Sequence, residues 1–334
     1  MECLRTFDYL ENLRQFAPKD DILARKVQGR WIRYSIDQYI EYSTLTAYAL
    51  LSLGYTEGTK IISLCNNRPE WNFLDMGSAL AHMIHIPIYS TLSAEEYLFI
   101  FNHSDAEVIV VGNRNFYKKI APVIEQMDRQ VKVIMMDDSD EILCFSKLYE
   151  TGRQNADKFR PIIENNKKSI SPDDIVSIIY TSGTTGTPKG VMLSHRNFTF
   201  DTHAHAVRQT RNSSHKMLSF LPLCHVYERT MNYEYQELGI SIYYAEGLAT
   251  IATDLADCKA DGFCSVPRVL DMMYGKLDAA GKKLGGIKRL IYLMAWHFAN
   301  NYDNENNGCF YLWRQKVYDR LVYKKWRDNL GKKC

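Results

Sequence analysis

Short apolar runs alternate with helix-period segments along the chain from about residue 58 onward. The runs that we expect to be strands are residues 60–65, 84–89, 106–111 and 131–136, and the helices expected between them include residues 70–82 and 94–103. Strands and helices that alternate at this spacing pair in parallel through right-handed crossovers, and helices then cover both faces of the sheet. The pattern predicts a doubly wound α/β layer.

A second α/β unit is expected after a polar connection. Residues 151–174 contain Gly152, Pro161, the run Asn165–Lys168 and the run Ser171–Asp174, which are turn and solvent-facing types, so we expect a connecting segment there. Strand-like residues resume near Met217 and continue to about residue 270. We therefore predict two mostly parallel-sheet subdomains, residues 40–215 and 216–334. Residues 1–39 are not assigned, and their packing on the second subdomain is one alternative.

The segment Tyr180–Gly190 combines glycines, hydroxyls and one lysine directly after the apolar run Ile175–Ile179. Glycines let backbone N–H groups converge on an anion, hydroxyls add neutral donors, and Lys189 adds a positive charge. In α/β folds ligands bind beyond the carboxyl ends of strands, where this segment is expected. The pattern predicts a phosphate-binding loop, and a polar surface turn is the alternative.

The loop differs from the Walker loop of nucleotide triphosphatases. That loop ends in Gly-Lys-Ser/Thr and opens a helix, whereas here Pro188 precedes Lys189 and Gly190 follows it. Residues 191–193 look like a second strand, and Ser194 is a favourable residue for the start of a helix. The expected order is strand, loop, strand, which weighs against a phosphate-binding NTPase.

Over the eleven residues Tyr180–Gly190 the chain closely resembles the signature of the adenylate-forming superfamily. This superfamily comprises acyl-CoA synthetases, luciferases and peptide-synthetase adenylation domains. The resemblance implies an N-terminal adenylation domain of α/β fold. It also implies that the loop holds the β- and γ-phosphates of ATP and that Thr181 lies near Mg²⁺. The implied ATP-binding residues are Thr181, Ser182, Gly183, Thr184, Thr185, Gly186 and Lys189.

Two further segments, residues 219–230 and 265–270, resemble the long-chain fatty acid–CoA ligase branch of that superfamily. The resemblance implies a catalytic position for His225 near the substrate carboxylate. Without it, a buried, hydrogen-bonded histidine at a strand end is the simpler interpretation. For Glu228 and Arg229 we favour an internal ion pair that holds the start of a helix.

Composition limits the classes of partner and location. The chain has 334 residues, 46% hydrophobic and 24% charged, with a net charge of +2, which fits a globular protein of two packed units and gives no indication of nucleic acid. We find no apolar run of 18 residues and no signal-peptide pattern, so a cytoplasmic location is expected.

The eight cysteines lack metal-ligand spacing and are expected to be reduced core thiols. His195, His203, His205 and His215 are expected to be solvated surface residues.

The C-terminal segment is basic and amphipathic. Residues 311–334 carry eight Lys or Arg against two Asp. Two adjacent helical rows, Trp313–Val317–Leu321 and Tyr318–Val322–Trp326, form an apolar stripe. We favour packing of the stripe on the rest of the protein, and peripheral contact with the inner face of a membrane is the alternative. The oligomeric state cannot be predicted.

The superfamily's later motifs are not found in this chain. These are a Tyr-Gly-x-Thr-Glu loop, a Thr-Gly-Asp and a C-terminal lid domain with a catalytic lysine, so the resemblance covers only the first half of a typical member. The implied reaction of the complete enzyme joins a fatty acid to ATP, giving acyl-adenylate and pyrophosphate, and then to CoA. We expect this chain alone to be inactive or nearly so. A truncated, non-catalytic assembly module is a further alternative.

Overall fold

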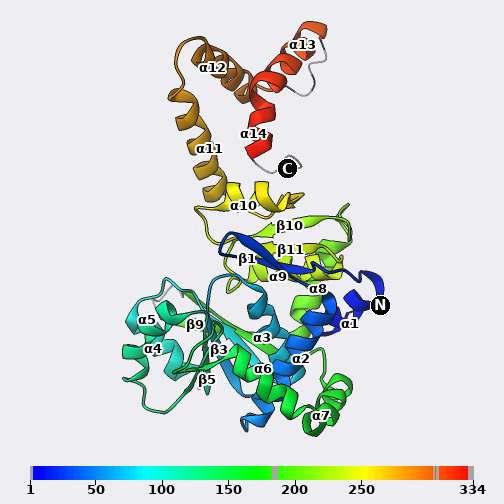
Figure 1. Cartoon of the computed structure of the whole chain (residues 1–334), viewed down its shortest axis with the longest axis vertical. Helices are drawn as coiled ribbons and strands as arrows, with labels where there is room; N and C mark the ends of the chain where they lie inside the picture. Colours follow the sequence, from blue (N-terminus) through cyan, green and yellow to red (C-terminus); the bar gives the residue numbers. More distant parts are fainter. Residues whose placement is uncertain (1–2, 183–186, 304, 306–307, 330–334) are drawn as a thin grey trace. The chain divides into compact units, whose positions relative to one another are not determined.

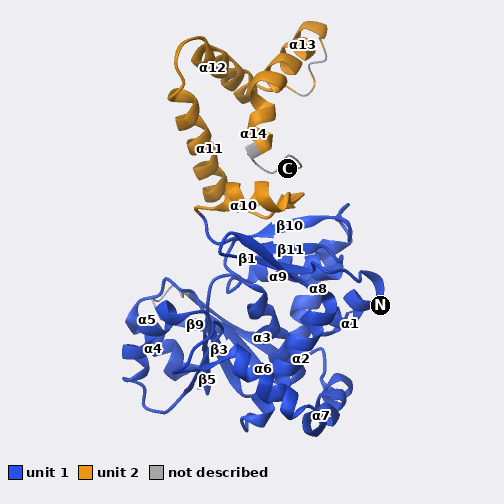
Figure 2. Cartoon of the chain, viewed as in Figure 1, with its two compact units in different colours: residues 1–248 blue, residues 249–334 orange. Residues whose placement is uncertain are grey.

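The computed structural model describes residues 3–182, 187–303, 305 and 308–329. The chain divides into two compact units, residues 1–248 and 249–334 (Figure 2). The subdomain boundary expected near residue 216 lies inside the first unit, between its two sheets. The two units are described separately.

The first sheet of unit 1 has seven strands among the described residues. Its order is β7–β6–β5–β3–β4–β8–β9, and all neighbours pair in parallel except β8 and β9. The bounds are β3 Lys60–Leu64, β4 Ile84–Pro87, β5 Val108–Val111, β6 Lys132–Met135, β7 Leu143–Cys144, β8 Ile175–Ser182 and β9 Pro188–Ser194. The strands predicted from the apolar runs are confirmed.

Helices cover both faces of this sheet, as the doubly wound pattern requires. One layer contains α4 (Ala94–His103) and α5 (Arg114–Ile124), which pack on the sheet through a shared apolar core. Another layer contains α2 (Ile36–Ser52), α3 (Pro69–Leu80), α6 (Phe145–Gln154) and α7 (Ala156–Ser169) (Figure 1). Every residue of α3 is buried, because this helix is enclosed by neighbouring elements.

The expectation of a connecting segment over residues 151–174 is wrong for most of its length. Helices α6 and α7 occupy residues 145–169, with Pro161 inside α7. Gly152 lies within α6, and a Cβ atom at this position would come 2.3 Å from the carbonyl oxygen of Leu45 in α2. Glycine here permits two helices to approach closely and does not mark a turn in a connecting segment.

A second sheet of unit 1 uses strands from both ends of the unit. Its order there is β10–β11–β1–β2, with bounds β1 Leu23–Val27, β2 Arg30–Tyr34, β10 Lys216–Ser219 and β11 Ser241–Tyr244. Strand β1 pairs in parallel with β11 and antiparallel with β2. The β1–β2 turn places Gln28 and Gly29 at φ 50° and 76°, the left-handed pair that a two-residue hairpin favours.

Three helices accompany this second sheet. They are α1 (Asp8–Phe16), α8 (His195–Ala206) and α9 (Val226–Glu237), and α9 is the crossover between β10 and β11. Helix α9 packs against α8 and α1, and its residues from Glu228 to Gln236 are buried. The start of α9 therefore lies at the carboxyl end of β10.

Unit 2 is largely helical. Its elements are α10 Ile251–Cys258, β12 Gly262–Phe263, α11 Pro267–Lys282, α12 Gly286–Asn300, α13 Cys309–Tyr318, the π-helix η1 Asp319–Tyr323 and α14 Lys324–Asn329. Tyr292, Ala295 and Phe298 of α12 pack with Tyr318 and Val322. None of the helices within the described residues combines the length and hydrophobicity needed to cross a bilayer.

The predicted C-terminal apolar stripe divides between core and solvent. Tyr318 and Val322 are buried, and Trp326 packs against them, so this row lies in the core of unit 2. Trp313 and Leu321 of the other row are exposed. The packing that we favoured for the stripe therefore holds for one of its two rows.

Candidate functional site

The predicted phosphate loop connects β8 and β9 at the carboxyl end of β8. The two strands form an antiparallel hairpin in which Thr181 is opposite Lys189, and both residues are exposed. Gly183, Thr184, Thr185 and Gly186 lie outside the described residues, as does the side chain of Ser182. The structure thus places the hydroxyl of Thr181 and the amine-bearing Lys189 on the two paired strands of the hairpin, close to the loop.

The hairpin is anchored by Tyr180, the residue before Thr181. The Tyr180 ring belongs to the core under α4, and its hydroxyl lies 2.8 Å from His103 Nδ1. Gly190 is opposite Tyr180, where a Cβ atom would lie 2.9 Å from Ile178 Cγ2 and 3.3 Å from Tyr180 Cζ. Gly190 therefore leaves room for the anchoring ring, which gives a packing reason for the glycine that follows Lys189.

Strand β9, rather than a helix, follows the loop. Helix α8 begins only at His195, after Ser194 caps its N-terminus in a reciprocal arrangement with Asn197. The predicted order of strand, loop and strand is confirmed, and so is the helix start at Ser194. The segment is not the strand–loop–helix arrangement of a Walker site.

His225 lies at the same edge of the first sheet as the hairpin. It is the N-cap of α9, and its Nδ1 accepts a hydrogen bond from the Tyr227 N–H at 3.2 Å. Its ring is 6.4 Å from the ring of Tyr89, just beyond β4, and β4 is the parallel neighbour of β8. The side chain is exposed, so the simpler interpretation as a buried core histidine is wrong.

Asn67 ties the segment before His225 to the carboxyl end of β3. Its Nδ2 donates to the Leu221 carbonyl at 2.6 Å and to Ser219 Oγ at 3.2 Å. Its Oδ1 accepts from the Leu223 N–H at 3.1 Å. A single Asn after a strand is an ordinary turn residue, so the sequence alone does not identify Asn67 as part of the site. The carboxyl ends of β3, β4 and β8 therefore all contribute to one edge of the first sheet, which we call the carboxyl edge.

Glu228 is a buried carboxyl group in the first turn of α9. Only 2% of it is exposed, and Ser219 Oγ donates to its Oε1 at 2.6 Å. Its Oε2 has no hydrogen-bond partner among the described residues. Burial raises the pKa of Glu228 to about 8, and the hydrogen bond from Ser219 only partly opposes this. The group therefore gains its proton at a much higher pH than an exposed glutamate does.

The expected Glu228–Arg229 ion pair is not formed, because each residue has a different partner. Arg229 Nη2 lies 2.6 Å from Asp75 Oδ1, and Nη1 donates to Ser177 Oγ. Successive residues of a helix point in different directions, so a pair one position apart is disfavoured. Asp75 lies 154 positions from Arg229 and could not be identified as the partner from the sequence.

The Asp75 carboxylate is the centre of a buried polar network. His85 Nδ1 lies 2.7 Å from Asp75 Oδ1, and His85 Nε2 lies 2.7 Å from Ser63 Oγ. The Tyr233 hydroxyl donates to Asp75 Oδ2. Burial disfavours the charged Asp75 carboxylate, but Arg229 and the hydrogen bonds from His85 and Tyr233 outweigh burial and lower its pKa.

The Ser63–His85–Asp75 arrangement has the order of contacts of a hydrolase triad but is closed to solvent. All three residues are at most 2% exposed. Burial also lowers the pKa of His85, although Asp75 favours the charged form. A substrate cannot reach Ser63. The network therefore has a structural role under the carboxyl edge of the first sheet and is not catalytic.

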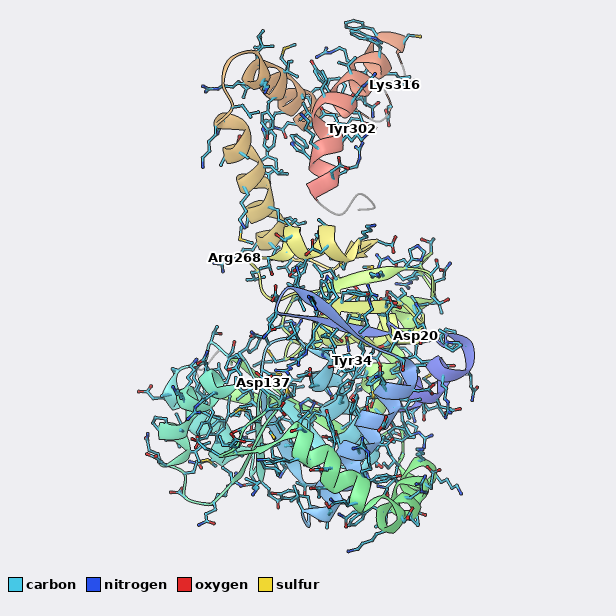
Figure 3. All side chains as sticks on the ribbon, in the orientation of Figure 1. Asp20, Tyr34, Asp137, Arg268, Tyr302 and Lys316 are labelled. Carbon is cyan, nitrogen blue, oxygen red and sulfur yellow. The ribbon has the colours of Figure 1, made fainter. Side chains whose placement is uncertain are left out.

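A separate polar cavity of about 640 Å³ lies beyond the carboxyl end of β6. Tyr34 and Asp137 line it (Figure 3). Arg68 connects two carboxylates beside it, with Nε 2.9 Å from Glu70 and Nη2 2.8 Å from Asp137. Arg25 Nη2 also lies 2.9 Å from Glu70. These two arginines and two carboxylates are paired with one another, so together they present no net charge to an ionic ligand.

The described residues offer no cluster of three or more His, Cys, Asp or Glu that could hold a metal ion. His195 was expected at the surface, but it is buried, and its Nδ1 accepts from the Thr6 N–H at 3.2 Å. Burial lowers the pKa of His195 to about 3. Among the cysteines, Cys144 and Cys258 are buried as expected, whereas Cys309 is exposed.

Comparison with protein families and curated proteins identifies relatives of the chain. Residues 13–299 match the family model described as AMP-binding enzyme. The chain is 29% identical to long-chain-fatty-acid–CoA ligase ACSBG2 of Xenopus laevis, over 92% of the chain and 43% of that protein. It is 26% identical to long-chain-fatty-acid–CoA ligase FadD15 of Mycobacterium bovis, over 94% and 52%. The chain thus spans about half the length of these relatives.

Solved structures share the fold. The N-terminal domain of FACL13 from Mycobacterium tuberculosis aligns with a TM-score of 0.68 at 21% identity, covering 80% of this chain and 64% of that one. A long-chain-fatty-acid–CoA ligase, FadD1, from Archaeoglobus fulgidus aligns with a TM-score of 0.69 at 18% identity, covering 83% and 54%. The family match spans most of the chain and includes the hairpin and the carboxyl edge described above. The chain belongs to the AMP-binding enzyme family and has the α/β fold of the N-terminal part of adenylate-forming enzymes.

Proposed function

We propose that this chain supplies the phosphate-holding part of an ATP-dependent fatty acid–CoA ligase. In the complete reaction the fatty acid carboxylate attacks the α-phosphorus of ATP, pyrophosphate leaves, and the thiol of CoA then displaces AMP from the acyl-adenylate. The observation that carries the proposal is the β8–β9 hairpin, where Thr181 and Lys189 face each other at the carboxyl edge of the sheet. The long-chain ligases among the relatives support a fatty acid as the substrate.

The hairpin suits the leaving pyrophosphate because its strands are anchored in the core and polar residues lie next to its loop. Tyr180 is held in the core, so the position of Thr181 and Lys189 is set by the sheet rather than by the loop. Groups that are already in place lose little entropy when they bind the developing negative charge. Thr181, Ser182, Gly183, Thr184, Thr185, Gly186 and Lys189 make up the proposed phosphate site.

His225 is proposed to lie beside the carboxylate of the fatty acid. As the N-cap of α9 it lies at the positive end of the helix dipole, which favours a nearby anion. Its exposure leaves the ring open to a substrate, and its proximity to Tyr89 places it at the edge that also carries the hairpin. His225 thus has a binding role in the proposal rather than that of a general base.

Magnesium would enter with the nucleotide. The described residues lack a carboxylate cluster for a protein-only site, and Mg²⁺ in phosphoryl-transfer sites commonly keeps water and phosphate ligands. Thr181 is proposed as a neighbouring hydroxyl ligand. When bound, Mg²⁺ neutralises charge on the phosphates. CoA is proposed as the acyl acceptor, and no described residue is assigned to it.

Binding of MgATP to the 334-residue chain tests the proposal. We expect calorimetry to detect binding and the substitution Lys189→Gln to weaken it by about tenfold or more, because a hydrogen bond to a charged group contributes roughly 1.5–3 kcal/mol. Lys168→Gln is the matched control, since Lys168 is exposed on α7, away from the hairpin.

Two results would overturn the proposal. Equal MgATP affinities for the native chain and Lys189→Gln would remove the phosphate role of the hairpin. Steady ATP hydrolysis without a carboxylic acid would indicate an NTPase instead, although β9 in place of a helix weighs against that activity.

A further inference from the structure

Asn67, Ser219 and Glu228 are joined by a directional chain of hydrogen bonds, and we call these three side chains the relay. The Asn67 amide donates one hydrogen to Ser219 Oγ at 3.2 Å, so this oxygen is the acceptor in that bond. The hydroxyl hydrogen of Ser219 is then free for Glu228 Oε1, which lies 2.6 Å away. Ser219 and Glu228 are each at most 2% exposed, so bulk water does not compete for the bond between them.

The Asn67 end of the relay fixes the turn that leads to His225. Asn67 Nδ2 donates its second hydrogen to the Leu221 carbonyl, and Oδ1 accepts from the Leu223 N–H. Between these two residues, the Pro222 carbonyl accepts from the His225 N–H at 3.0 Å. The backbone that places His225 at the carboxyl edge is therefore held by the Asn67 side chain.

The Glu228 end of the relay lies in the same helix turn as His225. His225 is the N-cap of α9 and Glu228 is three positions later, where a Glu side chain often reaches back to the N–H of the N-cap. Here Pro222 already binds that N–H, and Glu228 turns inward to Ser219. His225 is thus held from both of its sides along the chain by one set of hydrogen bonds.

We propose that Glu228 is a positioning residue for His225 and acts through Ser219 and Asn67. The inference rests on the proposed function, which places His225 beside the carboxylate of the fatty acid. Glu228 does not touch the substrate in this arrangement. It fixes the group that does.

The relay suits the neutral form of Glu228. Oε1 accepts from Ser219, which leaves the proton to Oε2, an oxygen without a hydrogen-bond partner among the described residues. Because burial raises the pKa of Glu228 to about 8, the group is mostly neutral at pH 7. Loss of the proton leaves a buried charge with one unpartnered oxygen, a costly state that is relieved when water enters the turn. His225 should therefore lose its fixed position as the pH rises through about 8.

The ionisable neighbours of Glu228 do not share this behaviour. Tyr244 of β11 interacts electrostatically with Glu228, but burial raises its pKa well above the ordinary value and keeps it neutral. Arg229 is paired with Asp75 of α3. Ionisable groups of α8 and α1 contact α9 nearer its C-terminal end, and they are His203, which pairs with Glu237, and Tyr9, which stacks on Tyr233.

Amide NMR of the 334-residue chain without ligand tests the proposal. At about pH 7, Glu228→Gln should leave the Leu223 and His225 amide signals in place, because its Oε1 still accepts from Ser219. Glu228→Leu removes that acceptor, so both signals should move. In the native chain both signals should also shift with a midpoint near pH 8, whereas Glu228→Gln should lack this step.

Met231→Leu is the matched control, because Met231 is another buried residue of α9 and the replacement nearly conserves volume. Both amide signals should stay in place in this variant. Asn67→Ala should displace the His225 signal, and adding Glu228→Leu to it should displace the signal little further, because both act through one chain of hydrogen bonds.

MgATP affinity reports on the hairpin and should be unchanged in the Glu228 variants, so failure of the proposed function and failure of the relay are distinguishable. If Glu228→Leu does not fold, the pH step in the native chain and its loss in Glu228→Gln decide the matter. Unmoved signals in a folded Glu228→Leu, moved signals in Met231→Leu, an equal pH step in Glu228→Gln, or additive effects of Asn67→Ala and Glu228→Leu would each overturn the proposal.

Discussion

At the scale of single residues, Glu228 is a carboxyl group held out of water at the start of α9. Its pKa of about 8 in the folded state is above the ordinary value of 4.5, so the unfolded chain ionises first as the pH rises. Stability from the protonated group is complete below pH 4.5 and is lost as the pH rises to about 8. Relative to the native chain, Glu228→Gln should therefore gain up to about 5 kcal/mol of stability between acid and alkaline pH, since one pKa unit is about 1.4 kcal/mol.

Urea unfolding at about pH 5 and about pH 9 measures this difference. We expect the stability advantage of Glu228→Gln to grow between the two conditions. Glu150→Gln, at an exposed position of α6, should show no such change. A pH-independent difference between Glu228→Gln and the native chain would show that Glu228 ionises normally in the folded state.

At the scale of elements, the contact between α2 and α6 depends on the absence of a side chain at Gly152. A methyl group there would lie 2.3 Å from a backbone oxygen, so the two helices must separate. We expect Gly152→Ala to lower the free energy of unfolding by roughly 1–3 kcal/mol or more, despite alanine's higher helix propensity. Gly275→Ala in α11, with open space around it, should be neutral or stabilising. Thermal and urea unfolding of both variants decide the matter, and a neutral Gly152→Ala contradicts the close contact.

The element scale also shows which parts of the fold the sequence could predict. The strands β3, β4 and β5 are strongly apolar and were predicted close to their observed bounds. Helices α6 and α7 were missed, because Gly152 and Pro161 usually interrupt helices and the contact with α2 is not visible locally. Strand β2 is mostly exposed and lacks an apolar run, and its pairing partner depends on long-range contacts.

At the scale of the whole first unit, Arg229 connects the parts of the unit built on its two sheets. It comes from α9 beside the second sheet, and its partners Asp75 and Ser177 belong to α3 and β8 of the first layer. Removing one member of a buried ion pair leaves an uncompensated charge, so Arg229→Met should cost roughly 3–5 kcal/mol. Arg196→Met, which breaks the exposed pair with Asp173, should cost less than about 1 kcal/mol.

A double-mutant cycle with Asp75→Asn separates the ion pair from packing effects. Once Asp75 has lost its charge, replacing Arg229 should destabilise the unit by less than it does in the native chain. Urea unfolding of the four variants provides the comparison. If the two substitutions are additive, then Arg229 contributes through packing alone and the ionic connection between the layers is wrong.

The candidate site was predictable only where its residues are close in sequence. The hairpin with Thr181 and Lys189, and the helix start after it, follow from local residue order. The clamp made by Asn67 on residues 219–223 and the Arg229–Asp75 pair join segments more than 150 positions apart. Such pairs are set by the packing of two sheets, and a single sequence does not reveal them.

Titration of the labelled chain with magnesium pyrophosphate, followed by amide NMR, tests the central claim most directly. Pyrophosphate lacks adenine and ribose, so its binding reports only on the phosphate-holding part. We expect the largest shifts at the amides between Thr181 and Lys189, with smaller shifts at the start of α9 and none in unit 2. Shifts centred elsewhere in the chain, or no saturable shifts at the hairpin, would contradict the account.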